Sequence, residues 1–368
     1  MRYSFGFRCR LVSIKLDCLR RVSGPYWCHG GSRIVLLAAS MGCTEVRLRD
    51  SIGIFLGGAP LPYCTLLMSH SAVVSLLAIA IWAGRLGLKP SICEKATPHN
   101  CRDVIAGLCS GLALASEYGA GLVVVGICVW YFFSDLKRAV IFGLGMVPSL
   151  LTIPGYHWIC FGDPFTFAYL HEHTFTTMHE GFFGIRFPPQ TEHAYMLLFS
   201  AERGLFFWSP ILLLAFPGYF RLWHTSPPLF WMTYLVPVLQ VTAISAYFLP
   251  SAGGMIGPRL LAPILPLLAL PLALGVTWFP RTGAVLGIVS ILVTVLATVV
   301  SIAGLYGANP LFDLLLPKFF ALSFSHNLGQ VAGLSGYTSI IPLVVVLVVS
   351  IWLTWCQLPR SEASIHKA

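Results

Sequence analysis

The sequence has little charge, and acidic residues are the scarcer kind. Only 10% of the 368 residues are charged, and 14 are Asp or Glu against 23 Lys or Arg. Soluble globular domains carry about 25% charged residues, so this composition excludes an ordinary soluble domain. Since 57% of the residues are hydrophobic, the chain is predicted to be an all-α, polytopic transmembrane helical protein whose partner is the lipid bilayer.

Motifs for metals and nucleic acids are also missing. The eleven cysteines form no CxxC pair, and a thiol in an apolar run usually behaves as a small hydrophobe. The net charge of +9 does not indicate nucleic acid, because the basic residues lie at the ends of apolar runs and in the first fifty residues. We therefore expect no nucleic-acid partner.

Residues 1–51 lack an apolar run long enough to cross a membrane. They contain nine of the 23 basic residues, and their longest apolar run is eight residues, against roughly 20 for a membrane helix. Two interpretations stay open: a disordered basic tail, or a segment that is not the natural start of the protein. Residues 52–368 are predicted to form the polytopic membrane domain.

Long apolar runs begin at residue 63. The predicted spans are 63–84, 104–133, a run ending near 160, 204–223, 229–249, 260–279, 283–306 and 338–356. The run 104–133 is interrupted at Glu117. Two short helices that break there place the basic loops 85–102 and 135–138 on one cytoplasmic side, which gives about 8–9 membrane segments.

This topology has a consequence for the leader. The region before residue 63 then lies outside, where nine basic residues are disfavoured. We therefore expect that a preceding span is missing or that residues 1–51 result from a wrong start.

The most polar stretch, residues 162–203, is predicted to be a long extracytoplasmic loop. It contains four of the eleven histidines and five of the fourteen acids, interleaved with aromatic residues. Long ordered loops between spans are usually functional. The stretch is therefore predicted to form a site at the membrane surface.

Several short motifs occur in a fixed order along the chain. They are Gly58-Ala59-Pro60-Leu61-Pro62-Tyr63, Ala106-Gly107-Leu108, Gly111-Leu112-Ala113, Ser116-Glu117-Tyr118, Phe161-Gly162-Asp163-Pro164, Gly181-Phe182-Phe183-Gly184-Ile185, Glu202-Arg203-Gly204-Leu205-Phe206, Ser209-Pro210, Gly253-Gly254 and Gly257-Pro258-Arg259. In this order they resemble the later part of bacterial membrane glycosyltransferases of the C-type superfamily, relatives of the dolichyl-phosphate-mannose protein mannosyltransferases. The resemblance covers about residues 52 to 280.

The resemblance implies an enzyme of the bacterial inner membrane that moves a sugar from a polyprenyl-phosphate carrier to an extracytoplasmic acceptor. In such enzymes an acid in the first outer loop, just after the first helix, acts as the base. That loop would precede Gly58, where this chain has the basic leader. The catalytic residue is therefore unknown, and we expect the chain by itself to be truncated and inactive.

Seven residues are candidates for substrate contacts: Arg259, Arg203, Glu202, Glu117, Asp163, His171 and Glu172. Arg259 and Arg203 are assigned to the lipid phosphate, and Glu202, Glu117 and Asp163 to the sugar or a metal. Each also has a structural interpretation. Arg259 can reach lipid headgroups, Glu202 and Arg203 can form a local ion pair, Glu117 can pair within the protein, and Asp163 before a proline can serve a turn.

The sequence His171-Glu172-His173 suggests a divalent metal ion, because imidazoles and carboxylates ligate transition metals. The spacing is not HExxH, so substrate hydrogen bonding or solvated polarity are the competing interpretations of His171 and Glu172, and no metal ligand set is assigned. His70 and His157, isolated within apolar runs, are predicted to be packed helix residues.

Two other classes of protein remain open. A transporter or flippase-like carrier would line a translocation path with Glu117 and Arg259, although the chain shows no internal repeat between its halves. A non-catalytic membrane subunit would not depend on either residue. The sugar, the acceptor and the oligomeric state are not encoded in any recognisable motif.

Overall fold

The fold is seen in a computed structural model that describes residues 68–84, 99–166, 168–171, 181, 184–304 and 307–356. The basic leader and Glu172 lie outside these residues. The described chain is mainly helical, as predicted, and within it β-pairing is limited to two isolated bridges.

The first half of the structure is a group of antiparallel helices. It comprises α5 (Ser69–Gly84), α6 (His99–Ser116), the short η2 (Tyr118–Ala120), α7 (Gly121–Ser134), α8 (Leu136–Leu150) and α9 (Thr152–Phe161). Helices α6 and α7 are separate, and Glu117 lies in extended backbone between them. The predicted break near Glu117 is confirmed.

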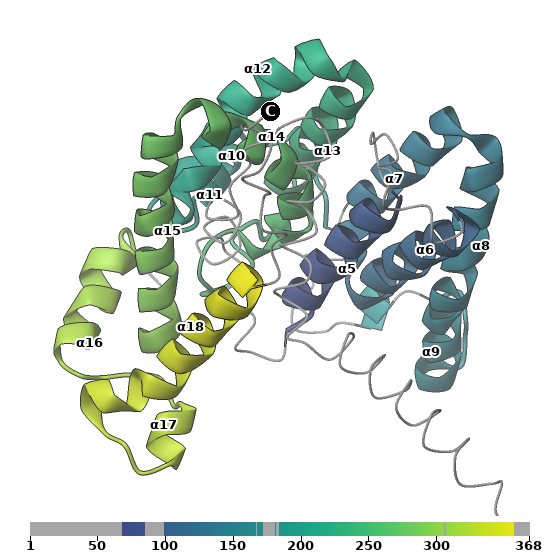
Figure 1. Ribbon diagram of the computed structural model, residues 1–368. Helices are drawn as coiled ribbons and strands as arrows, with labels where there is room; N and C mark the ends of the chain where they lie inside the picture. Colours follow the sequence, from purple (N-terminus) through teal and green to yellow (C-terminus); the bar gives the residue numbers. More distant parts are fainter. Residues whose placement is uncertain are drawn as a thin grey trace, which may run out of the picture.

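A second group follows in the chain and lies beside the first (Figure 1). After η3 (Ala168–His171) it comprises α10 (Thr191–Phe199), α11 (Leu205–Trp208), η5 (Pro210–Leu214), α12 (Ala215–Thr225), α13 (Pro227–Ser245), η6 (Arg259–Ile264), α14 (Leu265–Trp278) and α15 (Pro280–Val300). Every residue of α14 from Leu265 to Val276 is buried. A helix that is apolar on all sides belongs in the interior, so α14 is the central helix of this group.

The C-terminal part extends from α15 and is the yellow-green part of Figure 1. It comprises η7 (Leu311–Leu315), α16 (Leu316–Phe320), α17 (Leu328–Val331), η8 (Gly336–Ile340) and α18 (Ile341–Cys356). The short helix α10 lies inside the stretch 162–203, so part of the predicted loop is helical.

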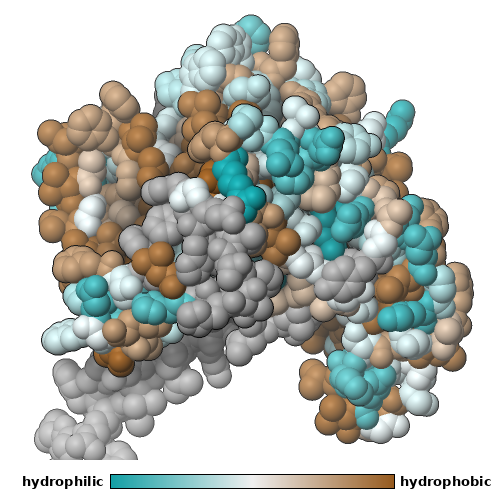
Figure 2. All heavy atoms as spheres, turned by 180° about the vertical axis from the view of Figure 1, so that it is seen from behind, coloured by the Kyte–Doolittle hydropathy of each residue, from teal (hydrophilic) through white to brown (hydrophobic). Residues whose placement is uncertain are grey.

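Four helical segments are long and apolar enough to cross a membrane. They are Leu136–Phe161, Pro227–Ser245, Arg259–Trp278 and Pro280–Val300. The segment Arg259–Trp278 has 20 residues, which corresponds to about 30 Å of helix and matches the hydrocarbon core. Figure 2 shows apolar side chains over large parts of the surface. Leu144 of α8, Leu151 between α8 and α9, and Ile159 of α9 are all more than half exposed. These features are compatible with an integral membrane protein.

Reciprocal glycine contacts hold two helix pairs at very short range. A Cβ on Gly218 of α12 would lie 1.6 Å from the carbonyl oxygen of Pro271, and one on Gly275 of α14 would lie 1.7 Å from that of Leu214. A Cβ on Gly107 of α6 would similarly lie 2.0 Å from a backbone oxygen of α8. Small residues at such crossings let membrane helices pack backbone against backbone.

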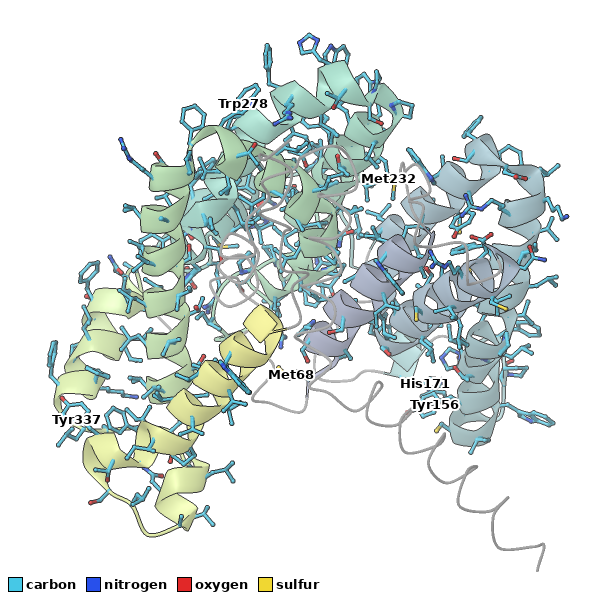
Figure 3. All side chains as sticks on the ribbon, in the orientation of Figure 1. Met68, Tyr156, His171, Met232, Trp278 and Tyr337 are labelled. Atoms are coloured by element: carbon cyan, nitrogen blue, oxygen red, sulfur yellow. The ribbon has the colours of Figure 1, made fainter. Side chains whose placement is uncertain are left out.

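The helices place two sets of polar residues at opposite ends. In Figure 3, Met68, Tyr156 and His171 lie at one end of the molecule, while Trp278 lies at the other. The start of α5, the end of α6 and the first part of α9 meet at the first end, which we call the pocket end. The end of α5, the start of α6 and the start of α8 meet at the second end, where Arg138 contacts both Gly84 and Asp103.

Candidate functional site

A pocket of about 740 Å³ lies at the pocket end, between the two helix groups. The first group contributes residues from α5, the end of α6 and α9, and the second contributes residues from the segment between α13 and η6. Its polar side chains are those of Ser69, His70, Ser116, Glu117, Tyr118, Thr152, Tyr156, His157, Tyr169, Tyr247 and Arg259. A volume of this size, between helices and with few charged groups, is typical of a small-molecule site.

Glu117 is the one carboxylate among the described residues that line the pocket. It occupies the N-cap position of η2, but its side chain makes no capping hydrogen bond. Instead the carboxylate oxygen Oε2 lies 2.8 Å from Nδ1 of His70, and both side chains are almost buried, with exposed fractions of 13% and 11%. The break between α6 and α7 thus turns a carboxylate towards an imidazole at the pocket wall.

Arg259 supplies the positive charge of the lining. It is the first residue of η6 and therefore stands at the start of the segment Arg259–Trp278. Its Nε is buried and has no hydrogen-bond partner among the described residues. A helix start carries a partial positive charge, which adds to that of the guanidinium and favours an anion here.

Four tyrosines line the pocket together with these two charged residues. The Tyr118 hydroxyl lies 3.0 Å from Nε2 of His157, and the Tyr118 ring packs edge-on against that of Tyr169. Burial, followed by the negative charge of Glu117, raises the pKa of Tyr169. Burial also raises the pKa of Tyr247 to about 12, an increase to which Tyr169 adds and which Arg259 opposes. Both phenols are therefore neutral at ordinary pH and can donate hydrogen bonds to a ligand.

Tyr247 is held in place by backbone pairing with residues of the polar stretch 162–203. Ile185 and Tyr247 form an antiparallel bridge, flanked by hydrogen bonds from the Phe248 amide to the Gly184 carbonyl (2.8 Å) and from the Arg186 amide to the Ala246 carbonyl (2.8 Å). The stretch 162–203 thus contributes to the site through Tyr169 and through this support of Tyr247.

Glu202 and Arg203 lie outside the pocket lining. Arg203 is 1% exposed, donates to the backbone carbonyl of Met255, and lies 3.6 Å from the carboxylate of Glu202. The Glu202 carbonyl accepts from the indole of Trp208 at 3.3 Å. This is the local ion pair that the sequence offered as the structural interpretation, and it ties α11 to the loop before η6.

Of the three remaining candidates, Asp163, His171 and Glu172, the two that the structure describes do not line the pocket. Asp163 is exposed and accepts from the Phe165 amide at 2.9 Å, which is the predicted turn role. His171 is exposed, stacks on Phe161 with ring centroids 4.4 Å apart, and does not line the pocket. Glu172 lies outside the described residues.

No group of three or more His, Cys, Asp or Glu residues that could hold a metal ion occurs in the described part of the chain. His173, His179 and Glu180 are not part of it.

The sequence predicted Glu117 and Arg259 as site residues but not the two histidines that hydrogen-bond to pocket residues. His70 and His157 were expected to be packed helix residues, and both are buried, yet both hydrogen-bond to pocket groups. A signal was present: each histidine lies within a few residues of the end of an apolar helix, on the side where Glu117 was expected.

Comparison of this chain with protein-family models, with curated proteins and with solved structures gave no match.

Proposed function

We propose that the protein is a membrane glycosyltransferase-like protein whose pocket binds a polyprenyl-phosphate sugar. The observation that carries the proposal is that Glu117 and Arg259, far apart in the sequence, line one pocket with opposite charges. Transfer from a lipid phosphate needs a cation for the phosphate, a carboxylate for the acceptor proton and room for a sugar between them. The pocket supplies these three features.

Arg259 is assigned to the phosphate. Its Nε has no hydrogen-bond partner among the described residues, and the helix start and the neutral phenol of Tyr247 add further favourable dipoles. As the bond between the anomeric carbon and the phosphate oxygen breaks, the electron pair stays on the phosphate oxygen. A guanidinium stabilises that developing charge.

Glu117 is assigned to the acceptor, in place of the first-loop acid that the resemblance implies. The proposal thereby departs from the expectation that the chain by itself is inactive. The acceptor hydroxyl gives its proton to the carboxylate while its oxygen bonds to the anomeric carbon, and His70 at 2.8 Å holds the carboxylate in position. The four tyrosines of the lining offer ring faces and hydroxyls for the sugar.

The proposal includes a membrane orientation. Among the described residues, nine segments are formed if α6, α12 and the three shorter apolar helices cross with the four long ones, and the pocket end is then extracytoplasmic. Lys137, Arg138, Arg221 and Arg281 stand at the opposite end, which the positive-inside rule assigns to the cytoplasm. The bacterial inner membrane provides both this polarity and polyprenyl-phosphate carriers.

A carrier is the second candidate, because the pocket lies between two helix groups rather than within one. Movement of one group against the other would expose such a site to the two sides in turn. The same residues would then bind substrate without breaking a bond.

The test uses the full chain in nanodiscs with undecaprenyl phosphate as the probe. Arg259→Gln should weaken binding about 10–100-fold, the range expected for a charge-assisted contact. The exposed cation Arg281 at the opposite end provides the matched control Arg281→Gln, which should bind as the wild type does. Equal affinities for the two variants would contradict the assignment.

Turnover separates the two candidates. An enzyme should release sugar from undecaprenyl-phosphate-mannose, and Glu117→Gln should lower that rate by about 100-fold or more. A carrier should move the intact lipid between leaflets of a vesicle with no bond cleavage. Binding without either activity would leave a non-catalytic subunit.

A further inference from the structure

One buried amide connects the two charged walls of the pocket. Gln240 of α13 is 1% exposed, and its Nε2 donates to the carbonyl of Gly119 at 3.0 Å and to that of Leu260 at 3.3 Å. Gly119 belongs to η2, and Leu260 is the second residue of η6. A single side chain thus joins the segment after Glu117 to the segment that begins with Arg259.

On the Glu117 side the link reaches a peptide that lies close to the Glu117 side chain. The Glu117 side chain lies over Gly119, because a Cβ built on Gly119 would be 3.4 Å from Oε1 and 3.8 Å from Cγ of Glu117. The glycine carbonyl that Gln240 holds therefore belongs to the residue on which the carboxylate rests. A shift of this peptide would move the carboxylate relative to His70.

On the Arg259 side the link reaches the residue next to the guanidinium. Leu260 itself lines the pocket, and η6 has no side-chain capping bond at Pro258. The hydrogen bond to the Leu260 carbonyl therefore fixes the start of η6 at a point where the helix has no cap of its own.

We propose that Gln240 is a positioning residue that sets the separation between Glu117 and Arg259 and thereby the ligand length that the pocket accepts. The inference rests on the proposed function only for the identity of that ligand. Gln240 does not line the pocket and so acts through the two backbone segments. Its Oε1 is buried with no partner among the described residues, which costs free energy of folding. The two hydrogen bonds that Nε2 donates must offset this cost.

The chain offers matched variants. Gln240→Met keeps the shape and removes both donors, whereas Gln240→His keeps one N–H donor at similar reach. Thr233→Val is the control: Thr233 is buried in the same helix, but its hydroxyl bonds to the Leu229 and Phe230 carbonyls of α13 itself.

Hydrogen exchange of the full chain in nanodiscs tests the link without any ligand. Gln240→Met should speed exchange at both Gly119–Gly121 and Leu260–Leu261 by about tenfold, Gln240→His by less, and Thr233→Val should leave both segments unchanged. Unchanged exchange at either segment in Gln240→Met would overturn the proposal.

Binding of undecaprenyl phosphate provides the second readout. We expect roughly tenfold weaker binding for Gln240→Met, partial recovery for Gln240→His, and wild-type affinity for Thr233→Val even where its thermal stability falls. An affinity loss in Thr233→Val equal to that in Gln240→Met would show that Gln240 acts only through the packing of α13. If wild-type protein does not bind the probe, the proposed function fails while the exchange result still decides the role of Gln240.

Discussion

Helices α5 and α6 carry polar residues at both ends, and the two ends are built in opposite ways. At the end away from the pocket, Asp103 is completely buried and receives hydrogen bonds from Arg138 Nε at 3.0 Å, Arg138 Nη2 at 2.7 Å and the Tyr131 hydroxyl at 2.9 Å. Arg138 also donates to the Gly84 carbonyl at 2.9 Å. This end is closed, since carboxylate and guanidinium satisfy each other.

At the pocket end the corresponding charges are kept apart. Glu117 is paired with an imidazole instead of a guanidinium, and Arg259 retains a buried donor with no partner in the part of the chain that the structure describes. The difference teaches that location in an apolar helix does not distinguish structural from functional charges. Within the described residues the two ends differ in the partner of the carboxylate, which is a guanidinium for Asp103 and an imidazole for Glu117.

The largest loss of stability is expected for Arg138→Met, at the closed end. It leaves the Asp103 carboxylate buried without its cation, which should lower the free energy of unfolding by about 3–5 kcal/mol. The neighbouring Lys137 is exposed, so Lys137→Met should change little. Denaturant titration in detergent measures both, and similar stabilities for the two variants would show that the ion pair does not hold this end together.

Arg203 tests the same distinction within the pocket end. Arg203→Met removes a buried donor from the Met255 carbonyl and should cost about 1.5–3 kcal/mol of stability. Because Arg203 does not line the pocket, affinity for undecaprenyl phosphate should be retained in the folded fraction. Arg259→Gln should show the converse, and a loss of binding in both variants would place the phosphate nearer to Arg203.

Ionisation of the Tyr247 phenol makes the stability of the pocket end depend on pH. Its pKa in the folded protein is about 12, above the ordinary value of 10, so the folded state holds this proton more tightly than the unfolded state. Its contribution to stability is complete below pH 10 and is lost as the pH rises towards 12. Stability of the wild type should therefore fall more steeply than that of Tyr247→Phe over this interval, and parallel pH curves would contradict the burial of the phenol.

The smallest effect is expected at Asp163. Its exposed carboxylate accepts one turn hydrogen bond, so Asp163→Ala should change stability by no more than about 0.5 kcal/mol and leave binding unaffected. A large loss of affinity in this variant would bring the carboxylate into the site and weaken the contrast between turn and pocket residues.

Apolar run lengths and the interruption at Glu117 were enough to predict the helical class, most helix positions and the two charges that line the pocket. The periodicity of a helix does not reveal which residues from other helices will face it, so the pairing of Glu117 with His70 and of Asp103 with Arg138 could not be predicted. Gln240 is an extreme case, since its role depends on two backbone carbonyls from segments on either side of α13 in the sequence. The number of membrane segments stays a prediction beyond the four long helices.

The reciprocal glycine crossings limit how the helices around the pocket can move. The backbones of α12 and α14, and those of α6 and α8, are in contact, so neither pair can slide or rotate without steric overlap. Each pair therefore moves as a rigid unit. Since the end of α6 lines the pocket, that wall of the site belongs to a rigid unit.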